Sequence, residues 1–252
     1  DMGFLPDIRR ILAEVPKERQ TMMFSATFPP EIAKLTGSMQ RNPARIEIGT
    51  IARPVDAVRQ SLYTVSKDKK TQLLSGILKQ DAMESILVFV RTKHGTDRLA
   101  KSLAKLGFKA EATHGGHTQN LRQRAIDGFR KGRHKILVAT DVAARGLDVR
   151  GITHVINYDV PGTSDDYIHR IGRTARASAE GDAITFVSPG EGRELGNIER
   201  SLGRKIDRVE WEGQVVIGSP GKPAGTRSYK PAGKNWKRGG GRRRPETGLR
   251  RY

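Results

Sequence analysis

Three arginines recur at intervals of three residues in the segment 169–176. Arg170, Arg173 and Arg176 carry guanidinium groups, and each group is a fork of N–H donors that matches two phosphate oxygens. Helical neighbours recur every three to four residues, so this spacing predicts that the three side chains share one face or one end of a helix. We interpret the series as a site for nucleotide phosphates. The competing interpretation is a surface helix whose arginines form weak salt bridges.

A second polar segment, Thr140–Asp148, directly follows the apolar run 136–139. It contains two aspartates, an arginine and a glycine and lacks apolar periodicity. Asp148 could accept hydrogen bonds from ribose hydroxyls, as acidic residues do in other nucleotide-binding folds. We therefore expect this strand end to hold the ribose and part of an RNA strand.

The turn His114–His117 holds two histidines around two glycines. With no cysteine in the chain and no carboxylate close by in sequence, we favour close backbone approach to a ligand over a metal site. Gln119 and Arg122 follow at the start of a predicted helix, where free N–H groups attract phosphate. By spacing alone, an ordinary solvated first turn is equally compatible. Ser25–Thr27 alone indicates only a strand end followed by a helix cap.

Short apolar strands alternate with amphipathic helices from residue 58 onwards, a pattern typical of βαβ units. The predicted fold is α/β, an open parallel sheet with helices on both faces, whose ligands bind beyond the carboxyl ends of the strands. All the polar clusters follow such ends. The predicted strands are 58–65, 86–90, 109–113, 135–139, 154–157 and 183–187, and the helices are 69–79, 97–106, 119–130 and 191–202.

The chain divides into four predicted parts. Residues 1–48 read as helix 6–13, strand 21–24, helix 30–38 and strand 44–48, the tail end of a first domain whose remaining strands would precede residue 1. Residues 49–57 form a linker, 58–205 the main domain and 206–252 a basic tail that we expect to be disordered from about 217.

Charge and composition favour a polyanionic partner. The net charge is +19 over 252 residues, and eleven of the 46 Lys and Arg lie in residues 217–252 with a single Glu. This clustering indicates nucleic acid rather than mere solubility. No apolar run approaches the ~20 residues of a membrane span, and no signal peptide is recognisable, so we expect a cytoplasmic protein that does not contact a membrane.

Taken together, the clusters resemble the motifs of DEAD-box ATP-dependent RNA helicases of the bacterial RhlE-like kind, over residues 1 to about 205. The matches occur in family order and spacing. Asp1–Phe4 resembles the segment after the DEAD motif, Ser25–Thr27 motif III, Val88–Thr92 motif IV, His114–Gly115 with Gln119 and Arg122 motif IVa, Ala139–Asp148 motif V and His169–Arg176 motif VI.

The resemblance implies a role for each matched residue. Arg173 and Arg176 would be arginine fingers on the ATP phosphates, while Gly146 and Asp148 would touch the nucleotide. Ser25, Thr27, His169 and Arg170 would couple hydrolysis to domain closure. The RNA phosphates and riboses would be held by Arg91, Gly115, Gln119, Arg122 and Thr140.

Two departures from the family pattern stand out. Ala175 replaces the usual glycine of motif VI. The Walker A loop, the DEAD carboxylates that bind Mg²⁺ and the adenine-reading motif are absent and would precede residue 1, so we predict no ATP hydrolysis by this chain alone. A non-catalytic RNA-binding or chaperone module and a DNA helicase of the same superfamily remain alternatives.

Overall fold

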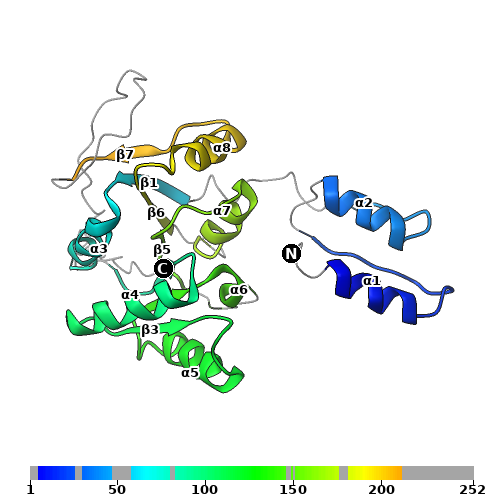
Figure 1. Ribbon diagram of the computed structural model, residues 1–252, viewed down its shortest axis with the longest axis horizontal. Coiled ribbons are helices and arrows are strands. Elements are labelled where there is room, and N and C mark those ends of the chain that lie inside the picture. Colours follow the sequence, from blue (N-terminus) through cyan, green and yellow to red (C-terminus); the bar gives the residue numbers. More distant parts are fainter. Residues whose placement is uncertain are drawn as a thin grey trace, which may run out of the picture. The chain divides into compact units, whose positions relative to one another are not determined.

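The computed structural model describes residues 5–25, 30–46, 58–79, 83–145, 149, 151–175 and 181–211. The chain forms two compact units, Asp1–Arg53 and Pro54–Tyr252, which are described separately (Figure 1). The division falls inside the segment 49–57 that we predicted as a linker. The predicted disorder of the tail concerns residues outside the described part.

The first unit contains the two helices that its sequence predicts, α1 (Leu5–Glu14) and α2 (Pro30–Met39). The predicted strand 21–24 is wrong, and no strand forms in the described part of 44–48. Phe24, expected to be buried, is 87% exposed. A strand needs a neighbouring strand to pair with. Segment 21–24 instead contacts the end of α2, where Nε2 of Gln40, the residue after the helix, donates to the Thr21 carbonyl oxygen at 3.2 Å.

The second unit is built on a seven-stranded, wholly parallel sheet in the order β3-β4-β2-β5-β6-β1-β7. This confirms the predicted α/β fold. Its strands are β1 (Val58–Thr64), β2 (Ile86–Phe89), β3 (Ala110–Thr113), β4 (Ile136–Ala139), β5 (His154–Asn157), β6 (Gly181–Val187) and β7 (Asp207–Val209). β7 pairs with β1, so the sheet extends beyond the boundary that we predicted at 205.

Helices cover both faces of this sheet (Figure 1). Val88 on β2 packs in the cluster that includes α3 and α4, whereas its neighbours Leu87 and Phe89 pack towards α5. Buried side chains alternate between the faces because successive strand residues point in opposite directions. The helices are η3 (Lys67–Lys69), α3 (Lys70–Leu78), α4 (Lys93–Lys105), α5 (Gln119–Arg130), α6 (Asp141–Ala144), α7 (Ser164–Ile171) and α8 (Gly192–Leu202).

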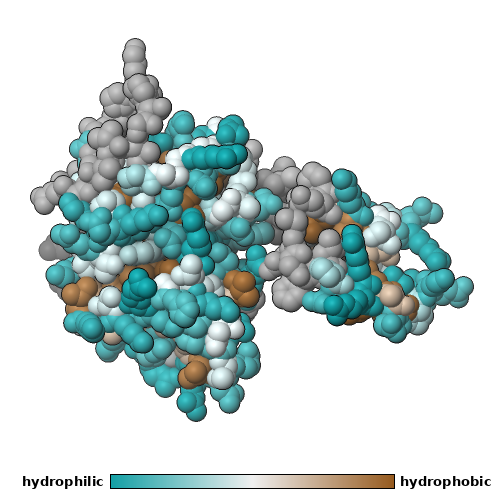
Figure 2. All heavy atoms as spheres, in the orientation of Figure 1, coloured by the Kyte–Doolittle hydropathy of each residue, from teal (hydrophilic) through white to brown (hydrophobic). Residues whose placement is uncertain are grey.

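The exterior of the second unit is predominantly hydrophilic on the side shown in Figure 2. Its apolar core is therefore enclosed between the sheet and the two helical layers. Among the described residues, none of the helices has the length and apolar character that crossing a membrane requires.

Two helices begin or end where the sequence pattern does not predict. α4 starts at Lys93 rather than Asp97, because the Thr92 side chain caps it by accepting the Gly95 N–H at 3.0 Å. α7 ends at Ile171, with Gly172 following it. Arg170 lies in the last turn of α7 and Arg173 lies beyond it, so among the described residues the arginines follow a helix end rather than one helical face.

Candidate functional site

Three of the residues predicted to bind RNA lie at the ends of adjacent strands. Arg91 follows β2, Gly115 follows β3 and Thr140 follows β4, and these strands are neighbours in the order β3-β4-β2. Backbone bonds continue past the strands, since Val90 N–H donates to Ala139 O at 2.9 Å. Parallel strands end at one edge, so the structure brings these positions together on the carboxyl edge, as predicted.

The first turn of α5 adjoins this edge because it follows β3. Thr118 caps the helix by accepting the Leu121 N–H at 3.4 Å, and Arg122 Nη1 donates to Gln119 Oε1 at 3.4 Å. Arg122 Nε is buried and has no hydrogen-bond partner within the described part of the chain. A buried donor without a partner is rare in proteins.

Arg91 is oriented by hydrogen bonds within the protein, yet its side chain stays largely exposed. Its backbone N–H donates to Asp159 Oδ2 at 2.9 Å, and its Nη2 donates to Val160 O at 2.9 Å and lies 3.3 Å from Glu191 Oε1. The side chain is still 57% exposed. The guanidinium is thus oriented by the protein and accessible to a phosphate.

Lys70 contacts the same two carboxylates as Arg91, although the sequence did not single it out. Its side chain is almost fully buried, with 2% of the residue exposed. Nζ donates to Tyr158 O at 2.8 Å and lies 3.3 Å from Asp159 Oδ1 and 3.4 Å from Glu191 Oε2. The two carboxylates that hold Arg91 therefore both lie next to one buried cation.

Arg170 corrects our interpretation of the arginine series as a row facing phosphates. It is 3% exposed, and its Nε and Nη2 donate to Asp141 Oδ1 at 2.6 Å and Oδ2 at 2.8 Å. Nη1 donates to Asn157 Oδ1 at 3.2 Å and to Asp159 O at 2.8 Å. The planar guanidinium of Arg170 bonds inside the protein and joins α7 to the start of α6, to the last residue of β5 and to Asp159 beyond it.

Ala175 lies beyond α7 in a backbone conformation that explains why glycine is usual there. Its φ angle is +53°, in the left-handed region that costs an L-residue roughly 1–2 kcal/mol. The preceding Thr174 is fixed, because its Oγ1 donates to Ile152 O at 2.6 Å. The turn therefore keeps its shape with alanine, at an energetic cost.

The remaining predicted residues divide into described and undescribed ones. Ser25 and His169 are exposed, and Arg173 is partly buried with its N–H donating to Arg170 O at 3.0 Å. Four predictions fall outside the described residues: Thr27, Gly146, Asp148 and Arg176.

The histidine turn also requires a correction. We saw no carboxylate near His114 and His117 in the sequence, but Asp97 on α4 approaches both rings. The start of α4 and the end of β3 meet at the same sheet edge, a proximity that sequence distance hides.

Burial perturbs two titratable groups near the sheet. Burial raises the pKa of the Tyr158 phenol, although its hydrogen bond with Thr71 opposes this. Burial lowers the pKa of His154, against the opposing effect of the Asp182 carboxylate. His154 begins β5, at the amino edge of the sheet, whereas Tyr158 directly follows β5 at the carboxyl edge.

Comparison with known proteins places these features in a family. Residues 69–178 match the model of the helicase conserved C-terminal domain. The DEAD-box ATP-dependent RNA helicase CshA of Geobacillus kaustophilus is 43% identical over 210 residues, covering 83% of this chain and 45% of the relative. CshA of Bacillus subtilis is 42% identical over the same length, which is 42% of that protein. The chain thus spans less than half the length of these relatives.

Solved structures agree. Saccharomyces cerevisiae Dbp5 bound to RNA and ADP BeF3 has a TM-score of 0.74 at 31% identity, over 82% of this chain and 56% of that one. The E. coli DEAD-box protein SrmB, bound to regulator of ribonuclease activity A, has a TM-score of 0.61 at 36% identity, over 66% of this chain and 98% of that one. The RhlE-like subdivision stays a prediction, whereas the sheet, the domain match and these relatives show that the chain belongs to the DEAD-box RNA helicase family.

Proposed function

We propose that the whole protein is an ATP-dependent RNA helicase that unwinds or remodels RNA duplexes, and that this chain supplies its second RecA-like domain. The observation that carries the proposal is the carboxyl edge of β3, β4 and β2, where Arg91, Gly115 and Thr140 lie on neighbouring strand ends. A single strand of nucleic acid can run along such an edge with its phosphates facing cationic side chains and free N–H groups.

RNA would be bound mainly through its sugar-phosphate backbone. Arg91 and Arg122 supply charge, while Gly115, Gln119 and Thr140 supply polar and backbone contacts along the same edge. Binding of this kind is weakly sequence-specific and strongly salt-dependent. The basic residues 206–252 would add a non-specific tether to RNA.

ATP would bind between this domain and a preceding one. Arg173 and Arg176 would stabilise negative charge on the phosphates, while Gly146 and Asp148 would contact the nucleoside. The Walker A loop and the carboxylates that hold Mg²⁺ would come from the preceding domain. Both domains are needed for one site, so this chain alone would not hydrolyse ATP.

Closure of the two domains would couple ATP to RNA. Arg170 links α7 to Asp141, directly after Thr140, through a two-pronged ion pair, so the proposed nucleotide and RNA segments are mechanically joined. Ser25 and Thr27, in the first domain, and His169, in the second, would take part in the same coupling. ATP-driven closure would bend one RNA strand and expel its partner.

The RNA part of the proposal is tested by salt-dependent binding to a labelled single-stranded RNA. Removal of one phosphate contact reduces the slope of log K against log salt by about 1, and we expect this for Arg122→Ala. Arg133→Ala is the matched control, since Arg133 is exposed between α5 and β4, at the opposite edge of the sheet. Equal slopes for the two variants would contradict the assignment.

The ATP part requires the full-length protein with both domains. An arginine finger contributes on the order of 10³–10⁵ in rate, so Arg173→Ala should abolish measurable RNA-stimulated ATPase activity while RNA binding persists. A protein that binds RNA but shows no ATPase activity even with Arg173 intact would be an RNA-binding or chaperone module. Competition between single-stranded RNA and DNA distinguishes an RNA helicase from a DNA helicase.

A further inference from the structure

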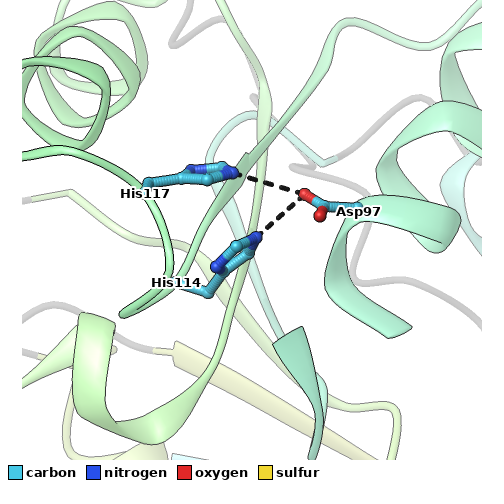
Figure 3. Close-up of side chains that lie close together, drawn as sticks. All are labelled: Asp97, His114 and His117. Carbon is cyan, nitrogen blue, oxygen red and sulfur yellow. Dashed lines mark hydrogen bonds and ion pairs between the residues drawn. The ribbon is translucent and has the colours of Figure 1, made fainter. Parts of the chain in front are cut away.

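A carboxylate and two imidazoles converge beside the glycine turn (Figure 3). Asp97 projects from the first turns of α4, His114 follows β3, and His117 lies two residues before α5. Asp97 Oδ1 is 3.0 Å from His114 Nε2 and 3.4 Å from His117 Nε2. All three potential ligand atoms lie within 4.8 Å of one another, and the ring centroids are 3.8 Å apart.

These separations fit the coordination sphere of a small divalent cation. Zinc binds histidine nitrogen and carboxylate oxygen at about 2.0–2.2 Å, so neighbouring ligands of a tetrahedral site lie about 3.3 Å apart. The distances from Asp97 Oδ1 to His114 Nε2 and His117 Nε2, 3.0 and 3.4 Å, need little adjustment to reach that value. Asp97 and His117 are partly exposed whereas His114 is buried, which leaves one side of the cluster open to solvent.

We propose that Asp97, His114 and His117 bind a divalent transition-metal ion of the zinc class, with water as the fourth ligand. Two imidazoles and one carboxylate suit zinc, cobalt or nickel, while magnesium and calcium favour sites made wholly of oxygen. The position joins three segments, the start of α4, the end of β3 and the turn before α5, which the Asp97–His114 and His117–His114 hydrogen bonds already connect.

The present hydrogen bonds define what metal binding must change. Gly116 N–H donates to His114 Nδ1 at 3.1 Å, so Nδ1 carries no hydrogen and Nε2 donates to Asp97. A metal on Nε2 requires this hydrogen to move to Nδ1, which deprives the Gly116 N–H of its acceptor. His117 has no such restriction, because its Nδ1 has no hydrogen-bond partner within the described residues.

Metal binding would therefore reshape the Gly115–Gly116 turn, and the glycines make that adjustment sterically easy. Lys93 lies against the same glycines, and its positive charge opposes a second cation. We accordingly expect micromolar affinity. If Gly115 contacts RNA, the ion would modulate RNA affinity, a consequence that rests on the proposed function; metal binding itself does not.

The test is a Co²⁺ titration of the 252-residue chain, purified without a histidine tag. We expect saturable visible d–d absorption at one equivalent, abolished by excess Zn²⁺. His117→Ala should weaken Co²⁺ binding at least about tenfold, a loss that even outer-shell partners of a metal can cause. His94→Ala is the matched control, because His94 lies on α4 but is exposed and outside the cluster; its affinity should equal that of the wild type.

A second variant guards against a folding defect. Asp97→Asn keeps the size of the side chain, and we expect it to retain the wild-type circular dichroism spectrum and weaken Co²⁺ binding. Absence of the d–d bands, or equal affinities of the wild type, His117→Ala and Asp97→Asn, would overturn the proposal and leave the cluster as a hydrogen-bonded structural contact. Because no RNA or ATP is present, failure here is independent of the proposed function.

Discussion

Replacement of Arg170 by methionine tests whether the buried arginine is structural as well as functional. Methionine keeps a long apolar side chain against Phe89, over whose ring the guanidinium now lies at 5.0 Å. It removes all four hydrogen bonds that the guanidinium makes. Asp141 loses its cationic partner, and the Oδ1 atom of the fully buried Asn157 loses a donor.

The expected cost follows from how far water can replace those partners. Breaking a buried ion pair from one side costs about 3–5 kcal/mol. The Asp141 side chain is 31% exposed and recovers part of its solvation, but Asn157 cannot, and an unsatisfied buried acceptor costs about 1–3 kcal/mol. We therefore expect a loss of about 3–4 kcal/mol in the free energy of unfolding, which lowers Tm by about 6–16 °C for a domain of this size.

Urea unfolding followed by tryptophan fluorescence measures this loss, because Trp211 packs against the core of the second unit. Arg200→Met is the matched control: Arg200 is exposed on α8, makes one hydrogen bond to Asn197 at 2.9 Å, and should change stability by less than about 0.5 kcal/mol. A double-mutant cycle with Asp141→Asn should show a coupling energy above about 1 kcal/mol. Equal stabilities of Arg170→Met and Arg200→Met would refute the reasoning.

Three further predictions concern the backbone at Gly181, the turn at Ala175 and the pH dependence of stability. Gly181→Ala should lower the free energy of unfolding in urea by about 1–3 kcal/mol, because the added Cβ would lie 2.7 Å from Ala175 N and press on the Thr174 side chain. Gly196→Ala is the control, since it has open space inside α8 and should raise that free energy by about 0.5–1 kcal/mol. Equal effects of the two substitutions would contradict the packing. Ala175→Val should lower the free energy of unfolding by about 1–3 kcal/mol, since a β-branched residue is strained at positive φ. Ala175→Gly should not lower it. A valine variant as stable as the wild type would show that the turn adjusts. Burial lowers the pKa of His154 from the usual 6.5. Just below pH 6.5 the unfolded chain therefore binds a proton that the folded protein does not. The free energy of unfolding should then decrease as the pH is lowered, with a slope of up to about 1.4 kcal/mol per pH unit. His154→Gln should flatten that part of the pH profile, and an unchanged slope would assign the pH dependence to another group.

The sheet was predictable from sequence because its signals are local. α5 (Gln119–Arg130) and β5 (His154–Asn157) match the predicted limits, since helical periodicity and a continuous apolar run each identify their element without knowledge of the rest. Segment 21–24 has the same apolar run, yet Phe24 is exposed. A run of apolar residues predicts a strand only where neighbouring strands are present to pair with it.

The partners of charged residues were not predictable, because they lie far apart in sequence. Lys70 meets Glu191 across 121 positions and Asp159 across 89, and Lys70 read as an ordinary residue of an amphipathic helix. Arg170 was singled out, but its spacing with Arg173 suggested either a shared helical face or a shared helix end, and α7 ends between the two residues. Residue spacing singled out Arg170, while only the fold shows that its guanidinium bonds inside the protein.

Asp159 shows why these internal ion pairs bear on function. Its Oδ2 accepts the Arg91 N–H, its Oδ1 lies next to Lys70 Nζ, and its carbonyl oxygen accepts Arg170 Nη1. Arg91, the proposed RNA contact, and Arg170, the proposed coupling arginine, are thus connected through the single residue Asp159. Because Arg91 and Arg170 are both bonded to Asp159, a displacement of α7 must move the Asp159 carbonyl, stretch its bond to Arg170, or break that bond. The first response shifts Arg91 at the proposed RNA edge, and Lys70 on α3 opposes it by holding the Asp159 carboxylate and the Tyr158 carbonyl oxygen.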